Sequence, residues 1–178
     1  MIGISKLYCG TVEPSDALRY GRKAANLPSH LLQFSEDKKP IVVWNCTRSC
    51  NLRCVHCYSQ SQCQHYEGEL TTDEGKRLLD SLAAFGAPVV LFSGGEPMMR
   101  KDLFELVQYA NAAGLRAVIS TNGTLITPEA AERLKNFNLS YVGVSLDGTE
   151  GVNDKFRGVE GAFARAMGGI RACLGVGL

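Results

Sequence analysis

From residue 41 onward, short apolar runs alternate with longer segments that carry apolar residues at helical spacing. The runs are rich in Val, Ile and Leu, and polar or Pro-containing segments bound them, which predicts strands of a parallel sheet. The first run directly follows Pro40 and fits a strand buried on both faces. The predicted strands cover residues 41–45, 88–92, 115–120 and 139–145.

The segments between these strands carry signals for helix starts and ends. Thr71 and Glu74 have capping-box spacing, Asp102 is expected to cap the next helix, and Thr127 precedes a proline at a first helical position. Gly114 stands where a glycine commonly follows a helix. The predicted helices begin at these caps and at Gly161, and they cover residues 71–85, 102–114, 127–136 and 161–174.

Four strand–helix units in succession predict an α/β fold with a parallel sheet, open or closed into a barrel. Each strand ends in polar or glycine residues, at positions 45–47, 93–95, 120–123 and 145–148. The carboxyl ends of parallel strands carry the active sites of such folds, so these clusters are expected to converge at one edge.

The sequence also predicts a division into an N-terminal extension and a core domain. Residues 1–40 are predicted to be an N-terminal extension, with a helix around 16–25 and a charged linker at 35–40. Residues 41–178 are predicted to be the core domain, incomplete at its C-terminus, because the fourth strand would otherwise be an exposed edge. We therefore expect the front part of a longer protein.

Composition narrows the class of protein. The chain has 178 residues, with 19 Lys and Arg against 18 Asp and Glu, a formal net charge of +1. This balance argues against nucleic-acid or anionic-membrane partners. Apolar runs such as residues 89–92 are too short to span a bilayer, and no signal-peptide pattern is visible. A cytoplasmic, soluble protein is expected.

Seven cysteines are unusual in such a composition, and five of them fall between positions 46 and 63. Cys50, Cys54 and Cys57 have C-x₃-C-x₂-C spacing, which suits three ligands of a [4Fe-4S] cluster with one iron left open. A zinc site completed by Cys63 or His65 is disfavoured, because no second C-x₂-C pair is present. A dithiol switch at Cys54 and Cys57 is disfavoured by the extra upstream cysteine. Cys46 is expected to pack as a small apolar residue at a strand end and not to bind a metal. No role is assigned to Cys9, Cys63 or Cys173.

Together with the turn Gly94-Gly95-Glu96-Pro97 after the second strand, the cysteine motif resembles the radical S-adenosylmethionine (radical SAM) superfamily over residues 41–178. The resemblance implies a partial (β/α) barrel, the front four units of an expected six. It implies an enzyme that reductively cleaves S-adenosylmethionine at a [4Fe-4S] cluster, giving methionine and a 5′-deoxyadenosyl radical. It also implies a low-potential electron donor such as ferredoxin or flavodoxin.

The same resemblance suggests which residues contact the cofactor. The Gly94–Pro97 turn would hold the methionine ammonium, with Glu96 offering its carboxylate to that cation. Arg157 would pair with the cofactor carboxylate, or be a solvated loop cation, and His56 would lie near the adenine. His30 and His65 are expected at the surface. Ribose or carboxylate contacts are expected from residues that also suit ordinary turns: Ser120, Asn122, Ser145 and Asp147.

A narrower resemblance concerns the substrate. Residues 1–10, 17–22 and 43–45 are similar to those of the deacetylases of the siroheme-dependent haem pathway, which remove two acetate side chains from the tetrapyrrole 12,18-didecarboxysiroheme to give iron-coproporphyrin III. Two alternatives stay open: a radical SAM maturase that modifies a peptide, and a truncated iron–sulfur binding module without turnover.

Overall fold

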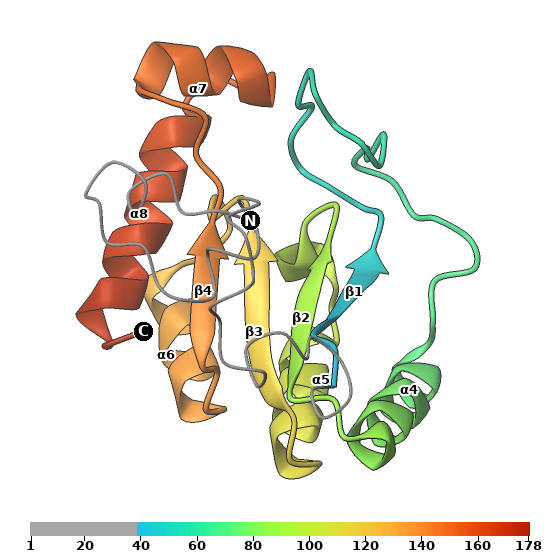
Figure 1. Ribbon diagram of the computed structural model, residues 1–178. Coiled ribbons are helices and arrows are strands. Elements are labelled where there is room, and N and C mark those ends of the chain that lie inside the picture. The colour runs from blue at the N-terminus through green and yellow to red at the C-terminus, as the bar shows by residue number, and fades with distance from the viewer. Residues whose placement is uncertain (1–38) are drawn as a thin grey trace, which may run out of the picture. The chain divides into compact units, whose positions relative to one another are not determined.

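In the described part of the chain, four parallel strands form one sheet in the order β1-β2-β3-β4 (Figure 1). The computed structural model describes residues 39–178. The strands lie within a few residues of their predicted positions, which confirms the parallel α/β architecture. The expected helix at 16–25, Cys9, His30 and most of the narrower resemblance lie outside the described residues. The strands are β1 (Val42–Thr47), β2 (Val89–Gly94), β3 (Arg116–Thr121) and β4 (Tyr141–Val144).

The helices follow the predicted order with two additions. Each of the four predicted helices is present, and the capping box forms: Glu74 N donates to Thr71 Oγ1, and Thr71 N donates to Glu74 Oε2 at 2.9 Å. A short 3₁₀ helix, η2 (Pro97–Met99), and a helix after β4, α7 (Glu150–Arg157), were not predicted. The remaining helices are α4 (Thr72–Phe85), α5 (Leu103–Ala112), α6 (Pro128–Asn136) and α8 (Ala162–Gly175).

Asp102 differs from its predicted role. It precedes α5, but its side chain makes no capping hydrogen bond. Its carboxylate instead accepts from Thr72 Oγ1 at 2.7 Å and from Arg100 Nη2 at 2.9 Å. A guanidinium is a stronger partner for a carboxylate than a backbone N–H, so the ion pair prevails over the cap.

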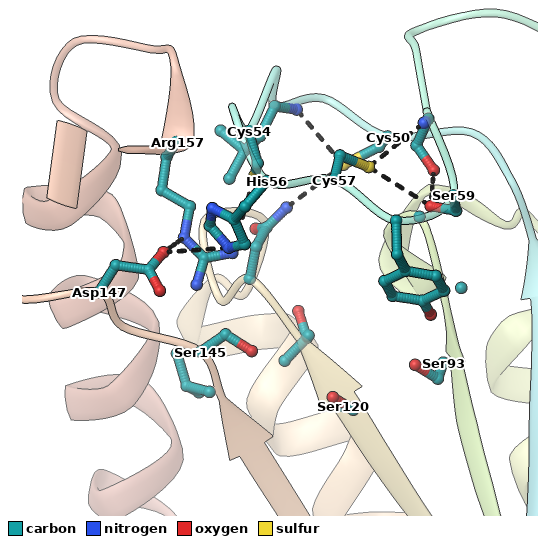
Figure 2. Close-up of a pocket in the computed structure, with 18 of the residues that line it drawn as sticks. Cys50, Cys54, His56, Cys57, Ser59, Ser93, Ser120, Ser145, Asp147 and Arg157 are labelled. Atoms are coloured by element: carbon teal, nitrogen blue, oxygen red, sulfur yellow. Dashed lines mark hydrogen bonds and ion pairs between the residues drawn. The ribbon is translucent and has the colours of Figure 1, made fainter. Parts of the chain in front are cut away.

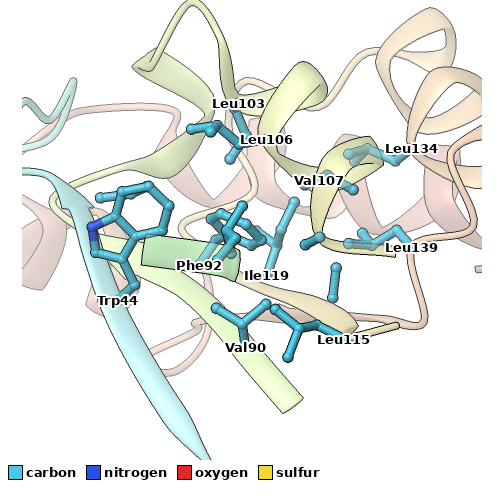
Figure 3. Packing of buried hydrophobic residues seen from close by; sticks show 14 of the residues in the cluster. Trp44, Val90, Phe92, Leu103, Leu106, Val107, Leu115, Ile119, Leu134 and Leu139 are labelled. Carbon is cyan, nitrogen blue, oxygen red and sulfur yellow. The ribbon is translucent and has the colours of Figure 1, made fainter. Parts of the chain in front are cut away.

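Among residues 39–178, the main hydrophobic cluster lies on one face of the sheet. Trp44, Phe92 and Ile119 point from successive strands toward the helices behind the sheet (Figure 3). On the opposite face of β1, the side chain of Val43 is 55% exposed. The prediction that this strand is buried on both faces is therefore wrong, because no described helix covers the second face.

The parallel strands direct the polar segments that follow them to one end of the sheet. The cysteine-bearing loop after β1 and helix α7 both lie at the end where the strands finish (Figure 1). There β1 is irregular: Asn45 pairs with Ser93 and Thr47 with Gly94, so Cys46 has no partner residue. Irregularities of this kind redirect side chains next to functional sites. None of the described helices has the length and apolarity needed to cross a membrane.

Candidate cofactor site

A cavity of about 490 Å³ opens where the strands end (Figure 2). The three cysteines of the C-x₃-C-x₂-C motif line it together with the ends of β2, β3 and β4, which confirms the predicted convergence for three of the four polar clusters. The cluster at 45–47 does not line the cavity, and the cysteine loop that follows it does. Its lining includes Cys50, Cys54, Cys57, Ser93, Gly94, Gly95, Ser120, Asn122, Ser145, Asp147 and Arg157.

The glycine pair at the end of β2 brings the backbone against the cysteine loop. Gly95 N donates to Thr47 O, and Glu96 N donates to Ser49 O, both at 2.8 Å. A Cβ atom at Gly94, whose φ is +133°, would lie 2.1 Å from Thr47 O. At Gly95 it would lie 2.5 Å from the carbonyl oxygens of Arg48 and Ser49. Only glycine fits here, because any side chain would push the cysteine loop away.

The thiols of Cys50 and Cys57 have different hydrogen-bond donors. None of the described cysteines forms a disulfide. Cys57 Sγ accepts from Ser61 N and lies 3.4 Å from Ser59 Oγ. Cys50 Sγ accepts from Leu52 N at 3.5 Å and from Asn122 Nδ2 at 4.0 Å.

These surroundings shift the two thiols in opposite directions. Burial raises the pKa of Cys50. Burial acts in the same sense on Cys57, but the hydrogen bonds from Ser59 and Ser61 outweigh it and lower the pKa of that thiol. A lowered pKa favours the thiolate, which is the form that ligates metals.

Glu96 lies behind the cavity wall. It is completely buried, and its carboxylate accepts from Thr121 Oγ1 and Asn122 N, both at 2.7 Å, and from Met98 N at 3.0 Å. Burial raises the pKa of Glu96, and these hydrogen bonds oppose that rise. Neither Glu96 nor Pro97 lines the cavity. The structure thus corrects the expectation that this carboxylate is free to meet a ligand cation.

Asp147 and Arg157 form an ion pair at the cavity wall. Arg157 Nε lies 2.7 Å from Asp147 Oδ2, and Arg157 is 9% exposed. Arg157 is therefore not a solvated loop cation, because it ends α7 and points inward (Figure 2). His56 also lines the cavity, half exposed, with Nε2 3.8 Å from Asp147 Oδ2 and its ring 5.7 Å from that of Phe156.

Comparison of the sequence with known protein families identifies the family of this chain. The family model described as "Radical SAM superfamily" matches residues 44–178, which contain all the cavity residues named above. The chain belongs to the radical SAM superfamily. The predicted partial barrel agrees with this, since the chain resembles a solved structure described as "Native anSMEcpe with bound AdoMet", with a TM-score of 0.63 and 21% identity over 76% of this chain and 40% of that one. At that identity the likeness concerns the fold alone.

The curated relatives of this radical SAM chain are longer proteins. The chain is 69% identical over 173 residues to the Fe-coproporphyrin III synthase of Methanosarcina barkeri, covering 97% of this chain and 43% of that protein. It is 48% identical to the AdoMet-dependent heme synthase of Nitratidesulfovibrio vulgaris, covering 82% and 41%. The mycofactocin maturase MftC of Mycobacterium tuberculosis is 42% identical, covering 79% and 36%. The chain thus spans about two fifths of the length of these relatives.

Radical SAM membership implies an iron–sulfur cluster and S-adenosylmethionine as cofactors, and the cavity residues fit them. Three reduced thiols face one space and receive N–H or O–H donors, as cluster sulfurs commonly do. Among residues 39–178, no group of three or more His, Cys, Asp or Glu side chains is arranged to bind a single metal ion. A cluster in which each cysteine binds a separate iron does not require the three sulfurs to converge on one ion.

The other described cysteines, Cys46, Cys63 and Cys173, lie outside this cavity. Cys63 is exposed, and it lines a separate groove with His65. Cys63 also lines a groove with Cys54 and Cys57, but Cys50 lies outside that groove, so neither Cys63 nor His65 shares a cavity with all three motif thiols. Cys46 is 2% exposed, and burial raises the pKa of its thiol to about 12, as expected of a small apolar filler. Cys173 is buried in a core cluster with Ile126.

Several site features were missed at the sequence level. The hydroxyls of Ser59 and Ser61 follow the motif directly, and their proximity to Cys57 was a usable signal. Helix α7 also had signals, since Thr149 precedes it, and Gly158 follows two basic residues. No sequence signal pointed to Thr121 as a partner of Glu96, because 25 residues separate them.

Proposed function

We propose that Cys50, Cys54 and Cys57 hold a [4Fe-4S] cluster whose fourth iron is open to S-adenosylmethionine. The observation that carries this proposal is the common cavity of three free thiols and the polar ends of β2, β3 and β4. When bound, the cluster and cofactor supply a 5′-deoxyadenosyl radical. The chain's own part is to hold, orient and shield them from water.

The cavity residues suggest a division of roles. Gly94 and Gly95 line the cavity beside the cysteine loop, where the methionine end of the cofactor would lie. The hydroxyls of Ser120 and Ser145 face the same space and suit ribose or carboxylate contacts. Asn122 lines the cavity while also donating to Asn51 Oδ1 at 2.8 Å, and it would join them. Asp147 and Arg157 form the wall on the β4 side.

For the substrate we propose 12,18-didecarboxysiroheme, with removal of two acetate side chains to give iron-coproporphyrin III. The 69% identity to a protein named Fe-coproporphyrin III synthase supports this choice over a peptide substrate, since the maturase relative is 42% identical. A low-potential donor such as ferredoxin or flavodoxin would reduce the cluster. The proposal concerns the whole enzyme, of which this chain corresponds to about two fifths.

The test is anaerobic reconstitution with iron and sulfide, followed by addition of a reductant and S-adenosylmethionine. We expect bound iron and sulfide, and formation of 5′-deoxyadenosine. Adding didecarboxysiroheme should then yield iron-coproporphyrin III. A bound cluster that never cleaves the cofactor would instead favour the binding module, and cofactor cleavage stimulated only by a precursor peptide would favour the maturase.

Replacing one motif cysteine tests the ligand assignment. We expect Cys54→Ala to lose most of its bound iron, sulfide and cofactor cleavage, because three thiolates are needed to leave a single iron open. Cys63→Ala is the matched control, since Cys63 is exposed and outside the cavity. Cofactor cleavage by Cys54→Ala at the wild-type level would remove the assignment.

A further inference from the structure

The C-terminal end of α7 lies directly against the cysteine loop. Arg53 N donates to Arg157 O at 3.0 Å, and Val55 N donates to Phe156 O at 2.9 Å. These two hydrogen bonds flank Cys54 on both sides along the chain. The position of the Cys54 backbone is therefore coupled to the last turn of α7.

The side chain of Arg157 reaches the same cysteine. Its Nη1 lies 3.8 Å from Cys54 Sγ, while its Nε lies 2.7 Å from Asp147 Oδ2 (Figure 2). Asp147 is itself placed by α7, because its backbone N donates to Asn153 Oδ1 at 3.0 Å and Asn153 is 1% exposed. The guanidinium is thus buried and oriented toward sulfur.

The three thiols differ in the charge of their donors. The described donors to Cys50 and Cys57 are backbone amides, a hydroxyl and the amide of Asn122, all neutral. The donor to Cys54 is a guanidinium, which remains charged at any pH that proteins tolerate. Charge-assisted hydrogen bonds are about twice as strong as neutral ones.

We propose that Arg157 is a positioning residue for Cys54 that raises the reduction potential of the cluster through this charged contact. The inference rests on the proposed cluster site and goes beyond it. Reduction adds one negative charge to the cluster, so a fixed cation beside a ligand sulfur stabilises the reduced state. Asp147 holds the guanidinium in place, and its own negative charge offsets part of that effect, so the stabilisation is the difference between the guanidinium 3.8 Å from the sulfur and the carboxylate paired with it.

The test is a redox titration of the reconstituted protein, followed by electron paramagnetic resonance and carried out without S-adenosylmethionine. Omitting the cofactor removes any effect of Arg157 on cofactor binding. We expect Arg157→Gln to retain its iron. At a given potential, its ratio of reduced to oxidised cluster should be about tenfold lower than in the wild type. For a one-electron couple this corresponds to a midpoint potential about 59 mV more negative. Arg157→Lys should recover most of the shift, because it keeps the charge.

Arg165→Gln is the matched control, because Arg165 is exposed on α8 and donates to Glu160 O away from the cavity. An unchanged midpoint in Arg157→Gln, or an equal shift in Arg165→Gln, would overturn the inference. Loss of the cluster from both Arg157→Gln and Arg157→Lys would overturn it as well, because a variant that keeps the charge should also keep the cluster. A wild-type protein that takes up no cluster would instead contradict the proposed function.

Discussion

Glu96 illustrates how a single side chain in this site supports its neighbours from outside the cavity. Its two carboxylate oxygens accept three hydrogen bonds, and one of the donors is the backbone N–H of Asn122. The side chain of Asn122 in turn donates to Asn51 beside Cys50. A buried carboxylate therefore links the end of β3 to the cysteine loop.

Replacing this carboxylate by an amide tests that link. In Glu96→Gln, the amide NH₂ would face one of the three donors, leaving buried polar groups unpaired. We expect the free energy of unfolding to fall by about 1–3 kcal/mol, measured by urea denaturation. The control is Glu105→Gln, which removes one partner of the exposed Lys76 pair and should have little effect. Equal stability of Glu96→Gln and wild type would contradict the assigned role.

Among the secondary-structure elements, α7 connects the strand ends to the cysteine loop through its last turn. Gly158 follows this turn with a φ of +66°, and a Cβ there would lie 2.3 Å from Arg53 O. Gly161 has a similar φ of +70°, but a Cβ there would meet only the flexible end of Arg165 at 3.2 Å. The two glycines therefore carry similar backbone strain and differ in their contact with the loop.

This difference gives a matched pair of variants. Gly158→Ala and Gly161→Ala should each lose about 1–2 kcal/mol of stability from the positive φ. Only Gly158→Ala should also take up less iron and sulfide on reconstitution, because its methyl group displaces the loop that carries Cys54. Thermal denaturation and iron analysis measure the two effects. Equal iron uptake by both variants would show that α7 does not hold the loop.

Three elements meet at Asp102, which joins η2, α4 and α5. Its Oδ1 lies 2.8 Å from Arg100 Nε, and its Oδ2 accepts from Arg100 and Thr72. Burial alone would raise the pKa of Asp102, but the bonds from Arg100 and Thr72 prevail and hold it below the ordinary value of 3.8. The ionised carboxylate therefore stabilises the folded state.

The sign of this shift sets a pH dependence. A carboxyl group with a lowered folded-state pKa contributes stability above its unfolded pKa, and the contribution is lost as the pH falls through the folded-state value. We expect Asp102→Asn to lower the free energy of unfolding by about 1–2 kcal/mol at neutral pH. Below pH 3.8 the difference from the wild type should become progressively smaller. Urea denaturation of both proteins across this range measures the difference. A cost that does not change with pH would contradict the ion-pair explanation.

Considered as a whole, the described part of the molecule has a core on one face of its sheet. Val90 in β2 is completely buried, whereas Val43 in the adjacent β1 is 55% exposed. The same substitution at these two positions compares the two faces directly. We expect Val90→Ala to lower the free energy of unfolding by about 2–3 kcal/mol, and Val43→Ala to lower it by less than about 0.5 kcal/mol. Similar losses in urea denaturation would mean that both faces are covered in solution.

Local sequence signals were sufficient for much of this architecture. The capping box of Thr71 and Glu74, the strand positions and the spacing of Cys50, Cys54 and Cys57 all depend on residues within a few positions of one another. Because the carboxyl ends of parallel strands lie together, the shared cavity also followed from the order of the elements. The motif residues were therefore predictable without knowledge of distant contacts.

Packing between distant segments determined the rest. Arg157 and Cys54 are 103 positions apart, and Glu96 accepts from Asn122 across 26 positions, so no local pattern encodes either pair. The exposure of Val43 depends on what covers its face of the sheet, and its apolar side chain gives no indication of that. Asp102 likewise pairs with the neighbouring Arg100 and with Thr72 instead of capping α5, and Thr72, 30 positions away, comes within reach only in the folded chain.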